Sequence, residues 1–150
     1  MAETHFIEIL DFAIRKEQES VDTYVMASRM VKRANVREML EALARQEEGH
    51  KKKLLDVKAG GTGMPRVEKM SDLRIADYSD TTEVTADMDY QDVLIVAMKR
   101  EQKAHNLYTI LASNANEAQL KELFENLANE ESRHKLALER EYDEHVLTDN

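Results

Sequence analysis

The sequence contains an internal repeat that covers most of its helical pattern. Shifted by 84 residues, positions 13–54 align without a gap with positions 97–138, and 13 of the 42 aligned positions are identical. The identical pairs include Ala13/Ala97, Glu17/Glu101, Tyr24/Tyr108, Leu43/Leu127, Glu47/Glu131 and His50/His134. A chain that repeats in this way is expected to fold into two similar halves around a pseudo-twofold axis. A side chain that one half places at the axis is then faced by its equivalent from the other half.

Apolar residues recur at helical spacing in four stretches, which predicts four helices. The stretches are residues 4–32, 35–60, 89–113 and 116–145. Asn35 and Glu38 have the spacing of a capping box, so we expect the second helix to begin at Asn35. Short connections within each half predict two antiparallel hairpins, residues 4–58 and 89–146. The expected fold class is all-α, a four-helix bundle.

The segment between the hairpins, residues 59–88, has a different composition. It holds three of the four glycines and the only proline of the chain, with a short helical pattern at 67–76. Because a 25-residue helix is about 37 Å long, a segment of this length can return along the bundle. We therefore expect a long crossover, and a single domain over residues 1–150.

Composition excludes several kinds of protein. The chain has no cysteine, so it has no disulfide framework and no cysteine-ligated iron site. With 30 acidic against 21 basic residues, its net charge of −9 is a poor match to nucleic acid or to an anionic membrane surface. No apolar stretch is long enough to span a membrane, and the N-terminus lacks the pattern of a signal peptide. We expect a cytoplasmic protein with no nucleic-acid or membrane partner.

Six acidic and histidine residues lie inside the apolar stripes, where unpartnered charge is strongly unfavourable. Residues three apart share a helix face, so each Glu-x-x-His pair projects two ligand groups together. Four carboxylates balance the charge of two divalent cations. Carboxylate and imidazole without thiolate suit iron or manganese and tolerate zinc. The sequence therefore predicts a dinuclear metal site whose metal ligands are Glu17, Glu47, His50, Glu101, Glu131 and His134.

Four motifs carry a resemblance to a known family over essentially the whole chain. They are EQESVDTY (17–24), LARQEEGHK (43–51), EQKAHNLY (101–108) and LANEESRHK (127–135). The sequence resembles the ferritin-like di-iron carboxylate superfamily and, within it, rubrerythrin-like proteins. The resemblance implies a ferritin-like bundle in which the same six residues hold two iron ions.

Two departures from the rubrerythrin pattern affect function. The cysteines of a rubredoxin module are missing, so electrons would come from a separate donor protein. The extra glutamate that rubrerythrins carry three residues after Glu101 is replaced by Ala104. The symmetric six-ligand set is closer to a bacterioferritin ferroxidase centre. Only a few residues follow the fourth helix, which disfavours a ferritin-type cage, and we expect a homodimer.

Several neighbours of the predicted ligands are candidates for a role at the site. Tyr24 and Tyr108 follow Glu17 and Glu101 by seven residues. Each is either a core aromatic, a hydrogen-bond donor to a metal-bound carboxylate or a redox-active phenol. His105 breaks the repeat, because its equivalent is Val21. It is either a histidine at the bundle edge or a proton donor or seventh ligand. Glu130 precedes Glu131 and is expected on a solvated face.

Three functional hypotheses follow. The first is a di-iron oxidoreductase of the peroxidase or oxidase type that reacts with hydrogen peroxide or O₂ and is re-reduced by an external donor. The second is a ferroxidase that stores or delivers iron. The third is a bundle with a purely structural metal.

Overall fold

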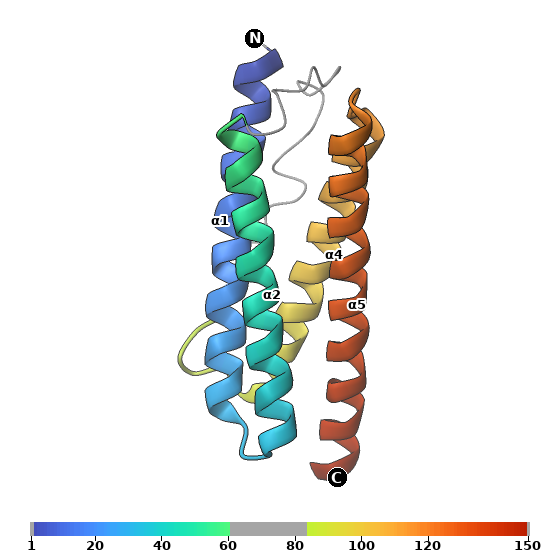
Figure 1. Cartoon of the computed structure of the whole chain (residues 1–150). Helices are drawn as coiled ribbons and strands as arrows, with labels where there is room; N and C mark the ends of the chain where they lie inside the picture. Colours follow the sequence, from blue (N-terminus) through green and yellow to red (C-terminus); the bar gives the residue numbers. More distant parts are fainter. Residues whose placement is uncertain (1, 61–83, 150) are drawn as a thin grey trace.

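The computed structural model describes residues 2–60 and 84–149, and in that part of the chain all regular structure is α-helical. The helices are α1 (Ala2–Met30), α2 (Ala34–Lys58), α4 (Tyr90–Asn114) and α5 (Ala118–Asp149) (Figure 1). None of the described helices is long and apolar enough to cross a membrane.

The four helices form two antiparallel hairpins. α1 and α2 are joined by residues 31–33 and lie side by side, as do α4 and α5, which are joined by residues 115–117 (Figure 1). α1 also packs against α4, and α2 against α5. α2 ends at one end of the bundle and α4 begins at the other (Figure 1). The predicted all-α four-helix bundle is therefore confirmed. Residues 61–83, which include most of the expected crossover and the helical pattern at 67–76, lie outside the described residues.

The start of α4 follows the sequence prediction, whereas the start of α2 does not. Asp89 caps α4 by accepting a hydrogen bond from the backbone N–H of Asp92 at 2.8 Å. The expected capping box at Asn35 is wrong, because α2 begins at Ala34 and its N-cap is Arg33, which makes no side-chain cap. The guanidinium of Arg33 instead donates to Glu141 on α5 at 3.2 Å. α2 therefore begins one residue before the position that the local pattern predicts.

Two apolar clusters fill the bundle, one towards each end. In every helix the residues of one cluster precede the predicted ligands and those of the other follow them. The first cluster includes Phe6, Leu10, Leu54, Leu111 and Phe124; the second includes Ala27, Leu40, Val93, Leu94 and Leu138. The predicted metal ligands therefore lie in a short polar layer between two apolar regions that exclude water along the bundle axis.

Candidate metal centre

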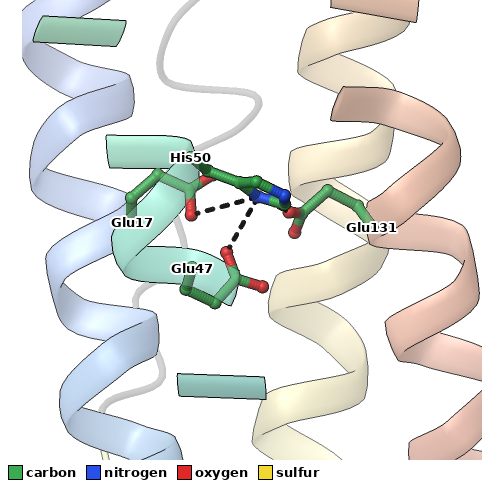
Figure 2. A group of neighbouring side chains, drawn as sticks. All are labelled: Glu17, Glu47, His50 and Glu131. Atoms are coloured by element: carbon green, nitrogen blue, oxygen red, sulfur yellow. Dashed lines mark ion pairs between the residues drawn. The ribbon is translucent and has the colours of Figure 1, made fainter. Parts of the chain in front are cut away.

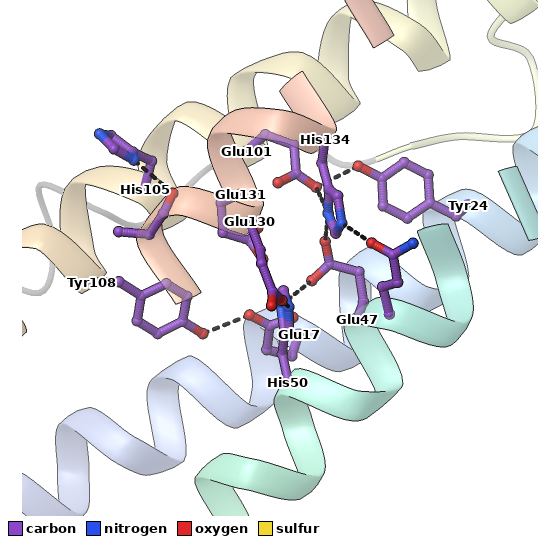
Figure 3. Close-up of polar contacts among 12 residues, drawn as sticks. Glu17, Tyr24, Glu47, His50, Glu101, His105, Tyr108, Glu130, Glu131 and His134 are labelled. Carbon is purple, nitrogen blue, oxygen red and sulfur yellow. Dashed lines mark hydrogen bonds and ion pairs between the residues drawn. The ribbon is translucent and has the colours of Figure 1, made fainter. Parts of the chain in front are cut away.

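The six predicted ligands meet at one level in the middle of the bundle. α1 and α4 each contribute one glutamate, whereas α2 and α5 each contribute a Glu-x-x-His pair. All six residues are buried, and none is more than 3% exposed. This arrangement follows from the repeat, because each hairpin places the same three groups on its inner face (Figure 3).

The ligand atoms form two groups that share two residues. One group is Glu17, Glu47, His50 and Glu131; the other is Glu47, Glu101, Glu131 and His134. Within each group, one atom from every residue lies within 4.8 Å of the others. Figure 2 shows the first group converging from α1, α2 and α5. Because Glu47 and Glu131 belong to both groups, each can offer one oxygen to each of two cations.

The Nδ1 atom of each histidine faces the carboxylates. His50 Nδ1 lies 2.6 Å from Glu131 and 3.4 Å from Glu47, and His134 Nδ1 lies 2.7 Å from Glu47. The two imidazole rings are stacked, with centroids 5.7 Å apart and planes 7° from parallel. Each hairpin therefore presents one inward-facing nitrogen to its own group of ligands.

The Nε2 atom of each histidine makes a contact on the outer side of the ring, across the α2–α5 boundary. His50 Nε2 contacts the carboxylate of Glu130, and His134 Nε2 lies 2.6 Å from the amide oxygen of Gln46. The expectation that Glu130 lies on a solvated face is therefore wrong. Glu130 and Gln46 are equivalent positions of the repeat, because they are 84 residues apart and each precedes a predicted ligand.

Burial and the neighbouring carboxylates shift the pKa values of the cluster. Burial disfavours protonated His50, but Glu17 and Glu47 outweigh this effect and raise its pKa to about 11. Burial likewise disfavours protonated His134, but Glu101 and Glu47 outweigh this effect and raise its pKa to about 9. Burial, reinforced by the other carboxylates, raises the pKa of Glu47 and Glu131 well above the ordinary value. The metal-free cluster therefore holds protons that a bound cation must displace.

The cluster fits a metal by the criterion of unsatisfied polar atoms. Among the described residues, three buried carboxylate oxygens of the cluster have no hydrogen-bond partner: Glu17 Oε2, Glu47 Oε2 and Glu101 Oε2. Buried polar atoms are nearly always paired in native proteins, so a concentration of unpaired acceptors at one point indicates a missing cation. Carboxylate oxygens with imidazole nitrogens are a suitable donor set for iron or manganese. The residues therefore fit a metal site.

Two tyrosines connect the hairpins at this level. The Tyr24 hydroxyl on α1 donates to Glu101 on α4, and the Tyr108 hydroxyl on α4 donates to Glu17 on α1 at 2.5 Å. Burial, with the nearby carboxylates, raises the pKa of both phenols well above the ordinary value, so both remain protonated donors. Each hydroxyl therefore lies where it can donate a hydrogen bond to a carboxylate that holds a metal.

His105 lies apart from the cluster (Figure 3). Its Nδ1 is 2.8 Å from the carbonyl oxygen of Ala128 and 2.9 Å from the Ser132 hydroxyl, so the ring links α4 to α5. Within the described part of the chain, neither of the two cation-binding groups includes it. This placement matches the interpretation of His105 as a histidine at the bundle edge.

We predict that His105→Ala leaves the number of bound metals unchanged. The lost hydrogen bonds should lower the free energy of unfolding by about 1 kcal/mol. Metal analysis after Fe(II) loading and urea denaturation measure the two effects. A tenfold or greater slowing of reoxidation, as expected for the loss of a positioned acid, would instead support the role of proton donor.

Comparison with known proteins places the chain in a family. No curated protein matches it. The solved structure of a hypothetical protein from Pyrococcus furiosus is similar, with a TM-score of 0.71 and 22% identity, covering 91% of this chain and 87% of that one. This likeness supports the fold. The family model described as Rubrerythrin matches residues 8–83 and 92–150. Because these residues make up most of the sequence, the chain belongs to the rubrerythrin family.

Proposed function

We propose that the protein is a di-iron carboxylate redox protein that reacts with hydrogen peroxide or O₂ and is re-reduced by a separate donor protein. The observation that carries this proposal is the pair of four-residue groups that share Glu47 and Glu131. A structural site for one metal needs no such sharing. Membership of the rubrerythrin family supports iron as the metal.

Each side chain of the cluster has a distinct part in this proposal. Glu17 and His50 would hold one ion, Glu101 and His134 would hold the other, and Glu47 and Glu131 would contribute to both, with Nδ1 of each histidine facing its group. When bound, a pair of ferrous ions supplies the two electrons that reduce peroxide to water. The hydrogen bonds from Tyr108 and Tyr24 orient Glu17 and Glu101. The apolar clusters on either side keep bulk water from the carboxylates.

A ferroxidase that stores or delivers iron is the alternative. The observation that favours it is the symmetry of the ligand set, since Ala104 stands where rubrerythrins carry a further glutamate. The two functions share the same site and differ in whether the iron remains there after oxidation.

Anaerobic loading with Fe(II), followed by separate additions of O₂ and hydrogen peroxide, tests the proposal. We expect the oxidant to convert about two ferrous ions per chain to the ferric state, and both ions to remain bound after desalting. Release of the oxidised iron would favour storage or delivery. Failure of both oxidants to change the iron spectrum would contradict a redox role.

We also propose that the protein is a homodimer. Sedimentation analysis should give twice the mass of the chain. A mass of twelve or twenty-four subunits would instead support the storage alternative.

A further inference from the structure

A small cavity lies between α1 and α4, directly beside the metal centre. Its volume is about 30 Å³. Because a single water molecule needs about 10–15 Å³ on the same scale, the cavity has room for a molecule of about two non-hydrogen atoms. Dioxygen and hydrogen peroxide are of this size, whereas an organic substrate is too large.

The cavity borders the metal centre itself. Glu17 lines the cavity and also belongs to one of the two groups of predicted ligands. Its Oε1 accepts the hydrogen bond from Tyr108, which lines the cavity as well (Figure 3). Its Oε2 is buried and has no hydrogen-bond partner among the described residues. A molecule in the cavity therefore lies against a side chain that would hold a metal.

Much of the cavity wall is apolar. Phe12, Ala13 and Leu107 line it and are only 6%, 1% and 4% exposed. Ala104 on α4 is partly buried and adds another small apolar side chain to the wall. Apolar cavities in protein interiors accept apolar guests such as xenon, so this wall suits dioxygen. The hydroxyl of Ser20, which also lines the cavity, can pair with hydrogen peroxide.

The charged side chains at the cavity favour a neutral guest over a metal cation. Three basic residues line it: Lys16, Arg100 and Lys103. Glu19 lies 3.4 Å from Lys16 and 3.2 Å from Arg100, so it balances only part of their charge. Basic side chains repel an approaching cation but do not act on the charge of a neutral molecule.

A second hollow near the metal centre is less suitable. It lies between α2 and α5, and its lining includes Gln46, Glu130 and His134. Nε2 of His134 faces Gln46, whereas Nδ1 faces the carboxylate of Glu47. The imidazole ring therefore stands between this hollow and the carboxylates that would bind metal.

We propose that the α1–α4 cavity receives the oxidant and that its size limits the oxidant to dioxygen or hydrogen peroxide. Ala13 and Ala104 determine this specificity, because their small side chains leave the space open. Occupation of the cavity needs no iron; only the oxidation rests on the proposed function. In that step two ferrous ions lose one electron each. With two protons, the electrons convert dioxygen to hydrogen peroxide, or break the O–O bond of peroxide to give two water molecules.

NMR of the Zn(II)-loaded protein tests the occupation of the cavity without any reaction. Dissolved dioxygen is paramagnetic, so it speeds the relaxation of methyl protons that it approaches. Ala97 is the matched control, because it is the repeat equivalent of Ala13 and only 3% exposed, but is not one of the lining residues. We expect dioxygen to speed relaxation at Ala13 several-fold more than at Ala97. Equal effects at the two methyl groups would overturn the proposal.

Two variants that fill the cavity test its part in oxidation. Ala104→Leu and Ala13→Val each place a larger side chain on the cavity wall, and Asn106→Leu, at an exposed position of α4, is the control. Both filling variants should still bind two metals. Hydrogen peroxide should oxidise their ferrous ions about tenfold more slowly or worse, because the oxidant is no longer held beside the metals. Unchanged rates in both folded variants would overturn the proposal.

The organic oxidant tert-butyl hydroperoxide tests the size limit. Two electrons and two protons convert it to water and tert-butanol, but its tert-butyl group is too large for the cavity. Leu107→Ala enlarges the cavity and should raise its rate relative to that of hydrogen peroxide by about tenfold or more. Circular dichroism checks the fold of this variant. An unchanged ratio of the two rates in the folded variant would contradict the size limit.

These measurements separate the cavity from the proposed function. Dioxygen beside Ala13, in a protein whose iron reacts with neither oxidant, would support the cavity and contradict the redox role. Iron that peroxide oxidises, without faster relaxation at Ala13 than at Ala97, would contradict the cavity and leave the redox role standing.

Discussion

Loading the metal-free protein with two equivalents of a divalent metal should raise its midpoint of thermal unfolding by more than about 10 °C. A ligand at a thousand times its Kd stabilises the folded state by about 4 kcal/mol, and 1 kcal/mol corresponds to about 2–4 °C in a domain of this size. The expected gain is large because the cation supplies partners for buried carboxylate oxygens that have none among the described residues. Calorimetry with and without Zn(II) or Mn(II) measures the shift.

Removing a shared ligand should abolish this stabilisation without unfolding the chain. In Glu47→Gln and Glu131→Gln, the amide resembles the protonated carboxyl that the raised pKa favours in the metal-free protein. Both variants should fold, bind at most about one metal and lose most of the thermal shift. Glu48→Gln is the matched control, because Glu48 lies next to Glu47 but is 54% exposed. Two metals and a full shift in both variants would contradict the assignment of the ligands.

The fold was predictable because the apolar spacing that marks each helix is local in the sequence, and because the pattern of one hairpin recurs in the other. Apolar spacing gave the four helices, and the 84-residue repeat indicated that they pair as two similar hairpins. The start of α2 differs from the prediction, and its N-cap residue Arg33 instead contacts Glu141, a residue 108 positions away. No pattern within one helix contains that contact.

The residues of the candidate site were predictable from the sequence, but the contacts that these residues make between helices were not. Helical spacing and the repeat place the six residues at one level, which the structure reproduces. The sharing of Glu47 and Glu131 depends on the distance between α2 and α5, which spacing along one helix does not determine. Glu130 was misplaced for a related reason. Its backbone position is off the inner face, but its long side chain reaches His50 across the helix boundary.

The contacts of Glu130 and Gln46 make the two halves of the site different despite the repeat. Since Nδ1 of each ring faces the ligands, the Nε2–H donates outward, to a carboxylate from His50 and to a neutral amide from His134. Burial would raise the pKa of Glu130, but the contact with His50 outweighs this effect and lowers it, so Glu130 is ionised. A carboxylate partner makes an imidazole a stronger metal ligand than an amide does. We therefore expect the metal beside His50 to bind more tightly than the metal beside His134.

Exchange of these two outer residues tests the asymmetry. Glu130→Gln should weaken the tighter metal by about 10- to 100-fold, the usual effect of losing such a partner, while the protein still binds two metals at saturation. Gln46→Glu should strengthen the binding of the metal beside His134. Titration with Zn(II) against a competing chelator resolves the two affinities. Glu139→Gln, at an exposed glutamate on α5, removes the same charge without a contact to either histidine.

The comparison with Glu139→Gln decides between two origins of the effect. If the loss of one negative charge is the cause, both variants weaken the metals equally, and the asymmetry has no basis in Glu130. If the contact with His50 is the cause, only Glu130→Gln brings the two affinities together, because it leaves both imidazoles with amide partners. The combined exchange of Glu130→Gln and Gln46→Glu should then restore two unequal affinities, with the tighter metal now beside His134, since the carboxylate has moved to that ring.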